Sequence, residues 1–288
     1  MKLSGHTTPF AVLGHPIGHS LSPLMHNASM RSLGYDGIYL ALDVHPDRLM
    51  EVLPAMAQMG FGGVNLTVPH KEIAFQGLTQ LDESAQLLGA ANTVAFTPDG
   101  LVGYNTDGYG FLTALESAFG KGVAGDHIFV LGCGGAGRAT ALLSAREGAS
   151  RLVLADIDQA RMEKLADEIK ALSSSVEVDC VQGRDAHIEA CRSCDLVIQA
   201  SPVGMRREDQ SLLPIDAFHA DQRVFDLIYM YPETALLTQA REAGAAIANG
   251  LDMLLHQGAR AFTIWTGETP DTARMRTVLE EAVYGTDS

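Results

Sequence analysis

The chain has 288 residues, of which 47% are hydrophobic and 19% charged, which is enough for one large or two ordinary α/β domains and excludes a disordered protein. The formal net charge of -15 argues against nucleic acid and anionic membranes as partners. The first ten residues hold no long apolar stretch and no window approaches about 18 apolar residues, so we expect no signal peptide, no membrane span and a cytoplasmic location.

The first third of the chain alternates short β-branched runs with helical patterns. A helix is predicted within residues 46–59, where apolar side chains recur at helical spacing, and residues 97–100 form a turn between two strands. This alternation predicts a parallel α/β architecture throughout. The strands predicted here are residues 10–14, 38–44, 63–68 and 93–96.

A second α/β unit is predicted to begin near Asp107 with a helix over residues 108–119. The remaining strands are predicted at residues 127–131, 151–155, 176–181, 195–200 and 223–228, followed by helices at 252–265 and 271–284. Terminal helices after a completed α/β unit often pack back on the first domain. We therefore expect a substrate-binding domain at 1–106, joined by helices of about 250–288, and a Rossmann-type domain with a doubly wound parallel sheet at 107–249.

A glycine-rich turn follows the apolar strand 127–131 and precedes a helix at 138–146. It gives the pattern G-x-G-x-x-G at Gly132, Gly134 and Gly137, in the strand–turn–helix context that binds dinucleotides. Each glycine has its own reason: Gly132 permits a tight turn, and Gly134 lets the backbone approach the pyrophosphate. Gly137 allows helix and strand to pack closely. A methyltransferase-type loop and a structural glycine cluster are the alternatives.

An acidic residue, Asp156, ends the next strand 24 positions after Gly132. A carboxylate there accepts hydrogen bonds from both adenosine ribose hydroxyls and repels the 2′-phosphate of NADP. This residue favours the dinucleotide interpretation over the alternatives.

The four cysteines and ten histidines give no metal signature. Cys191 and Cys194 form a C-x-x-C motif that suits a redox pair or half a metal site, but no second motif accompanies it. We interpret both as reduced thiols near a core.

Three segments hold unusually dense polar chemistry at predicted strand ends, where ligands collect in open α/β sheets. They and three further motifs closely resemble the shikimate dehydrogenase family, in family order and over nearly the whole chain. The motifs are GHPIGHSLSP at 14–23, NLTVPHK at 65–71, AANT at 90–93, NTDG at 105–108, GCGGAG at 132–137 and NGLDMLLHQ at 249–257.

The resemblance implies that the chain interconverts shikimate and 3-dehydroshikimate with NAD(P). Lys71 would be the catalytic acid/base beside the reacting hydroxyl, and Asp107 its partner. The structural alternatives are a solvated lysine at a helix start and a helix cap at Asp107. Ser20 and Ser22 resemble the hydroxyl pair that binds the substrate carboxylate, although Ser22-Pro23 also suits a helix start.

The resemblance also implies the remaining contacts of the site. Closure of the two domains would complete the pocket. Further substrate contacts would come from Asn65, Thr67, Asn92, Tyr229 and Gln257. Cofactor contacts would come from Gly132, Gly134, Gly135, Ala136, Gly137, Asp156, Ile157, Arg161, Ser201, Ile228 and Gly250.

The run Asp156-Ile157-Asp158 departs from the family pattern. Members that use NADP carry Asn-Arg-Thr there, with the arginine on the adenine and the 2′-phosphate. Two carboxylates, with only Arg161 downstream, predict a preference for NAD over NADP. This also brings the chain nearer to the NAD-linked quinate/shikimate branch.

Two finer expectations concern which ring acid is the substrate and which oligomeric state the protein adopts. Quinate-favouring relatives tend to carry threonine where this chain has Ser22, so shikimate is the expected substrate and quinate the alternative. A non-catalytic cofactor sensor is disfavoured by the Lys71–Asp107 pair, and a methylene-tetrahydrofolate dehydrogenase by the SLSP and NTDG segments. We expect a monomer or a homodimer.

Overall fold

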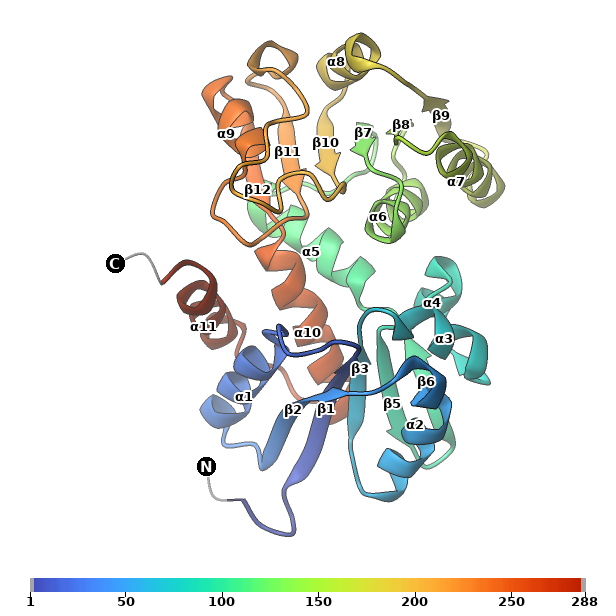
Figure 1. The fold of residues 1–288 in the computed structure, drawn as a ribbon, viewed down its shortest axis with the longest axis vertical. Helices are drawn as coiled ribbons and strands as arrows, with labels where there is room; N and C mark the ends of the chain where they lie inside the picture. The colour runs from blue at the N-terminus through green and yellow to red at the C-terminus, as the bar shows by residue number, and fades with distance from the viewer. Residues whose placement is uncertain (1–2, 286–288) are drawn as a thin grey trace. The chain divides into compact units, whose positions relative to one another are not determined.

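The computed structural model describes residues 3–285, and the chain divides into two compact units (Figure 1). Unit 1 comprises the residues up to Gly110 and those from Leu254 onward, whereas unit 2 comprises Phe111–Met253. The chain therefore leaves unit 1, completes unit 2 and returns to unit 1. Substrate binding by unit 1 and cofactor binding by unit 2 stay predictions.

A six-stranded mixed sheet forms the centre of unit 1. Its strands are β1 (Thr8–Gly14), β2 (Gly37–Asp43), β3 (Gly63–Leu66), β4 (Gln80–Leu81), β5 (Thr93–Thr97) and β6 (Gly100–Tyr104), in the order β2-β1-β3-β5-β6-β4. β1 is parallel to β2 and β3, but β5 is antiparallel to β3 and β6. The expectation of parallel strands throughout is wrong here, because the turn after Thr97 reverses the chain into a hairpin.

Helices cover both faces of this sheet. They are α1 (Ser22–Leu33), α2 (Leu49–Gln58), α3 (His70–Gly77), α4 (Glu83–Leu88), α10 (Leu251–Thr266) and α11 (Thr272–Tyr284), with a short 3-10 turn at Pro46–Arg48. Successive β1 residues alternate between the faces. Ala11 and Leu13 pack with residues of α2 and α3, whereas Phe10 and Val12 pack with Met30 of α1 and Phe262 of α10.

The terminal helices pack on unit 1, which confirms the expectation for them (Figure 1). Trp265 of α10 donates its Nε1 hydrogen to the Val94 carbonyl of β5 at 3.1 Å. This approach requires Gly63 in β3, because a Cβ there would lie 2.2 Å from the Trp265 Nε1. The start of α11 is joined to α1, since the Asp271 N–H donates to the Ser29 hydroxyl.

Unit 2 contains a six-stranded parallel sheet of the Rossmann type. Its strands are β7 (His127–Leu131), β8 (Arg151–Ala155), β9 (Glu177–Cys180), β10 (Leu196–Gln199), β11 (Arg223–Asp226) and β12 (Ala246–Asn249), in the order β12-β11-β10-β7-β8-β9. All five pairings are parallel, as predicted for this domain. The strand order reverses between β7 and β10, so the carboxyl ends of these two strands are the expected ligand crevice.

The helices of unit 2 cover the two faces of its sheet. They are α5 (Asp107–Phe119), which begins in unit 1, α6 (Gly135–Arg146), α7 (Gln159–Leu172), α8 (Arg184–Arg192) and α9 (Ala235–Glu242), with a 3-10 turn at Ile215–Ala217. Phe129 and Leu131 of β7 pack on the face covered by α8 and α9. Side-chain caps fix the starts of α7 and α9, at Asp158 and Thr234. Among residues 3–285, no helix is both long and apolar enough to cross a membrane.

Candidate active site

Lys71 and Asp107 form an ion pair in unit 1. The Lys71 Nζ lies 2.7 Å from the Asp107 Oδ2, and the two side chains are 31% and 20% exposed. Lys71 is in the first turn of α3, just after β3, and Asp107 is the first residue of α5, just after β6. A half-buried amine and carboxylate in hydrogen-bond contact can accept or release a proton at a bound hydroxyl.

Asn92 orients the second oxygen of this carboxylate. Its Nδ2 donates to the Asp107 Oδ1 at 2.8 Å, while its own Oδ1 accepts the Thr106 N–H at 2.8 Å. The Asp107 N–H donates to the Asn105 Oδ1, so Asn105 satisfies this backbone donor at the start of the helix. Both Asp107 oxygens therefore have defined partners before any substrate binds.

Ser20 and Ser22 lie together at the start of α1. The Ser22 N–H donates to the Ser20 Oγ at 3.3 Å, and Ser22 is only 8% exposed. α1 does start at Ser22-Pro23, but Leu21 rather than Ser22 is the N-cap residue, and no side chain caps this helix end. Both hydroxyls lie beside an uncapped helix N-terminus, which suits a carboxylate.

The other expected substrate residues divide between the two units. Thr67 follows β3 and donates its N–H to the Leu13 carbonyl, whereas Asn65 is buried within β3. Gln257 lies on α10 in unit 1, where its Nε2 donates to the Leu254 carbonyl at 2.8 Å. Tyr229 belongs to unit 2, and burial raises the pKa of its phenol. Its pairing with the unit 1 residues stays a prediction.

Packing within unit 2 requires two of the three motif glycines of the glycine-rich turn. A Cβ on Gly137 would lie 1.8 Å from the Gly132 carbonyl oxygen, and Gly132 has a φ of +97° and would meet the Ser201 backbone nitrogen at 2.7 Å. Packing therefore demands these two glycines. A Cβ on Gly134 would meet nothing within 4 Å, so packing within the unit does not explain its lack of a side chain.

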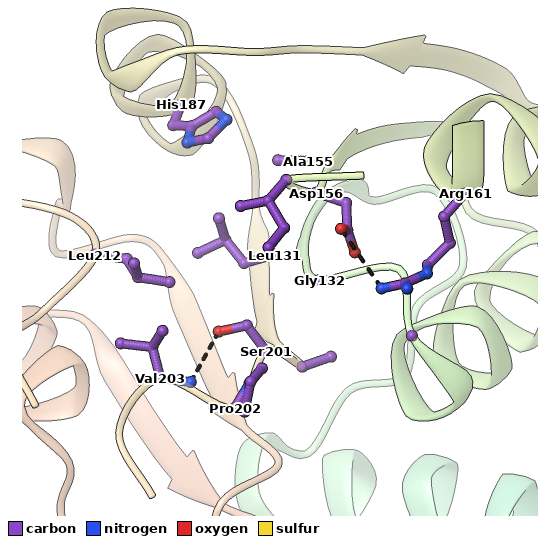
Figure 2. Close-up of a pocket in the computed structure, with 13 residues that line it drawn as sticks. Leu131, Gly132, Ala155, Asp156, Arg161, His187, Ser201, Pro202, Val203 and Leu212 are labelled. Carbon is purple, nitrogen blue, oxygen red and sulfur yellow. Dashed lines mark hydrogen bonds and ion pairs between the residues drawn. The ribbon is translucent and has the colours of Figure 1, made fainter. Parts of the chain in front are cut away.

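A cavity of about 300 Å³ opens at this turn, at the carboxyl ends of β7, β8 and β10 (Figure 2). The first turn of α6, including Gly135 and Ala136, begins beside it, and helix N-terminal N–H groups bind phosphates. The position at the strand-order reversal, the turn and the open space at Gly134 fit a dinucleotide.

The acidic run borders the same cavity. Asp156 accepts the Cys133 N–H on its Oδ2 at 2.6 Å and the Asp158 N–H on its Oδ1 at 2.8 Å. Figure 2 shows Arg161 reaching toward Asp156, at 3.7 Å, and its other terminal nitrogen lies 3.4 Å from an Asp158 oxygen. Ile157 is fully exposed. Two carboxylates thus surround the one guanidinium.

The three remaining expected cofactor residues follow β10, β11 and β12 of unit 2. Ser201 lines the cavity, and its hydroxyl accepts the Val203 N–H. Gly250 is required by packing, because a Cβ there would lie 2.1 Å from the Leu227 carbonyl oxygen. Ile228 is buried, and its N–H donates to Asp226. A nicotinamide contact of Gly250 or Ile228 stays a prediction.

Sequence reasoning missed His187 and Leu212, which also line the cavity. His187 is on α8, after β9, and Leu212 is in the long loop after β10. No motif marks either residue. Their only signal is topological, since loops that follow neighbouring parallel strands meet at one edge of the sheet.

The four cysteines are free, and Cys191 and Cys194 are buried in the core of unit 2. That these two residues serve only as reduced thiols stays a prediction. Burial raises the pKa of each of these two thiols to about 12. Within residues 3–285, no group of three or more His, Cys, Asp or Glu side chains could hold a metal ion.

Cys133 of the glycine-rich turn should resist alkylation. Burial, and then the nearby Asp156 carboxylate, raise the pKa of this thiol to about 12, so the reactive thiolate is scarce at neutral pH. We expect iodoacetamide at pH 7.5 to modify only the exposed Cys180 in the native protein and all four thiols after denaturation, as read by mass spectrometry. Rapid labelling of Cys133 in a Cys180→Ser variant would contradict this.

Comparison with known proteins identifies the family. A model of the shikimate dehydrogenase substrate binding domain matches residues 12–94, and one of the shikimate 5'-dehydrogenase C-terminal domain matches residues 250–280. The protein named shikimate dehydrogenase (NADP(+)) from Methanopyrus kandleri is 40% identical over 98% of both chains. The chain belongs to the shikimate dehydrogenase family.

Other comparisons cover both units of this shikimate dehydrogenase family member. A relative of the same name from Moorella thermoacetica is 42% identical over 98% of this chain and 96% of its own. The crystal structure of Listeria monocytogenes shikimate 5-dehydrogenase in complex with shikimate and NAD has a TM-score of 0.91 at 32% identity, covering 97% and 98% of the two chains. A model of the saccharopine dehydrogenase NADP binding domain matches residues 128–205, which include the glycine-rich turn.

Proposed function

We propose that this protein interconverts shikimate and 3-dehydroshikimate with NAD(P). The observation that carries the proposal is the Lys71–Asp107 ion pair in a chain whose family members are named for this reaction. A bound nicotinamide supplies the hydride acceptor for the carbinol carbon. The protein must then take the hydroxyl proton, and a half-buried lysine paired with a carboxylate suits that task.

The proposed roles of the other residues follow from what they can donate. Ser20 and Ser22 hold the ring carboxylate as neutral donors at a helix N-terminus, and Tyr229 is the substrate contact proposed from unit 2. Thr67, Asn92 and Gln257 contact ring hydroxyls. Their orientation of the ring brings the reacting hydroxyl to the Lys71–Asp107 pair, and proximity of this kind lowers the barrier.

An assay of two substrates with two cofactors tests which ring acid the enzyme prefers. Shikimate and quinate are each oxidised with NAD and with NADP, and kcat/KM is compared. We expect shikimate with NAD to give the highest value. Quinate is the second candidate, because the acidic run after β8 resembles the NAD-linked quinate/shikimate branch. Efficient quinate turnover with negligible shikimate turnover would overturn the first choice.

The cofactor preference follows from charge at the end of β8. Asp156 and Asp158 outnumber Arg161, so a 2′-phosphate would enter a region of net negative charge, whereas ribose hydroxyls can donate to Asp156. We therefore propose NAD as the preferred cofactor, although close relatives are named for NADP(+).

An Asp156→Asn variant tests this preference. The amide oxygen still accepts the Cys133 N–H, but the charge is lost, so the KM for NAD should rise about 10-fold while the KM for NADP stays equal or falls. Asp167→Asn, an exposed position on α7, is the control for the charge change. An unchanged ratio of the two KM values would show that Asp156 does not select the cofactor.

The proposed enzyme acts in the cytoplasm as a monomer or homodimer. The acidic composition is consistent with this location. Light scattering after gel filtration measures the assembly, and a larger oligomer would contradict it.

A further inference from the structure

Tyr39 of β2 places a phenol hydroxyl in the interior of unit 1. The residue is 1% exposed, and its Oη donates to the Asn65 Oδ1 at 2.6 Å. Burial raises the pKa of Tyr39 well above its ordinary value, and a hydrogen bond from Ser22 acts against this. The phenol therefore keeps its proton and donates it in the hydrogen bond to Asn65.

The ring of Tyr39 is fixed as firmly as its hydroxyl. His26 stacks on it with 4.2 Å between the ring centroids and 5° between the planes. Burial lowers the pKa of His26 to about 3, so this neighbour stays neutral. The Tyr39 hydroxyl has little freedom to seek another partner.

Asn65 uses its whole amide inside the unit. Besides accepting from Tyr39, it donates from Nδ2 to the Thr93 Oγ1 at 2.9 Å and to the Asn92 carbonyl at 3.2 Å. Both amide hydrogens are taken, and Asn65 is only 5% exposed. Asn65 therefore has no donor left for a ring hydroxyl, and a substrate contact could use only its Oδ1 as an acceptor.

Thr93 carries the connection to the acid–base pair. Thr93 is fully buried at the start of β5. Its hydroxyl accepts a hydrogen bond from Asn65 and donates one to the Asn92 Oδ1 at 2.9 Å. Asn92 in turn donates to Asp107, which holds Lys71. A continuous set of hydrogen bonds thus runs from Tyr39 to Lys71.

We propose that Tyr39, Asn65 and Thr93 form a positioning relay, which fixes Asn92 and so sets the Asp107–Lys71 pair for proton transfer. The inference rests on the proposed function. The relay begins at the Tyr39 hydroxyl, which donates to Asn65, and ends at the Lys71 ammonium, which donates to Asp107.

Thr93 gives the sharpest test. Thr93→Val keeps the shape but removes the hydroxyl, whereas Thr93→Ser keeps the hydroxyl. We expect kcat for shikimate oxidation to fall about 10-fold in Thr93→Val, since small displacements of acid–base groups are costly, and to recover in Thr93→Ser. Tyr39→Phe should behave like Thr93→Val, while Tyr35→Phe, a half-buried tyrosine outside the relay, serves as the control.

An isotope effect separates positioning from mere stability. With shikimate deuterated at the carbinol carbon, slower chemistry in Thr93→Val should raise the deuterium isotope effect on kcat, with the Kd for NAD unchanged. A loss of folded protein would instead lower kcat at a constant isotope effect. A constant isotope effect, or equal rates in Thr93→Val and Thr93→Ser, would overturn the relay.

A second readout needs no turnover. If the relay orders the ion pair, trinitrobenzenesulfonate should modify Lys71 faster in Thr93→Val than in Thr93→Ser, as measured by mass spectrometry. Equal rates would contradict the relay. Failure of the proposed function would appear differently, as no turnover of shikimate by the unaltered protein with either cofactor.

Discussion

Replacing Lys71 with alanine should lower kcat for shikimate oxidation by about 10²–10⁴-fold, the usual contribution of general acid–base catalysis. The ammonium lies 2.7 Å from Asp107 and is 31% exposed, so it can reach a bound hydroxyl while Asp107 holds it in place. The cofactor cavity lies wholly in unit 2, so the Kd for NAD should not change. Steady-state kinetics and fluorescence titration measure the two quantities.

Two further lysine variants make this result specific. Lys164→Ala removes a 78% exposed lysine on α7 and should leave kcat as it is. Lys71→Arg keeps the positive charge but not an amine that can give up its proton, so it should stay slow. Near-normal turnover in Lys71→Ala would show that another group moves the proton.

Gly137→Ala should abolish cofactor binding and destabilise unit 2. The new Cβ would lie 1.8 Å from a backbone oxygen, which cannot move aside as a flexible side chain can. Separating α6 from the turn at Gly132 should cost more than about 3 kcal/mol of folding free energy, because such a clash exceeds ordinary overpacking. Thermal unfolding and NAD titration measure both losses.

Gly134→Ala distinguishes a ligand site from a packing site in the same turn. Nothing lies within 4 Å of the place that the new Cβ would take, so the variant should fold with an unchanged Tm. The methyl group would stand where the backbone meets the pyrophosphate, so NAD should bind at least about 10-fold more weakly. Gly122→Ala, which also has open space, is the control. Unchanged NAD affinity in Gly134→Ala would mean that the pyrophosphate does not contact this turn.

The sequence was most informative where chemistry and local structure coincide. The glycines of the turn and Asp156 could be predicted because strand, turn and helix are contiguous there. The antiparallel direction of β5 could not, since periodicity gives the faces of a strand but not its partner. Only the short turn after Thr97 indicated the hairpin.

The candidate acid–base pair was predicted from family motifs, but the residues that orient it were not. Tyr39 looks like any aromatic residue in an alternating strand, and Thr93 like any β-branched one. Their hydrogen bonds join strands that are far apart in the sequence, and the spacing of residues along the chain does not reveal such partners. A substrate contact of Asn65 stays a prediction.

The packing of Trp265 against Gly63 also bears on how the protein is made. A ribosome delivers all of unit 2 before the part of α10 that carries Phe262 and Trp265 has emerged. Until then, the sheet face with Phe10 and Tyr39 is covered by α1 alone, and the part that α10 covers remains exposed to other chains. Unit 2 can complete its core during synthesis, so the first segment translated is the last to finish folding.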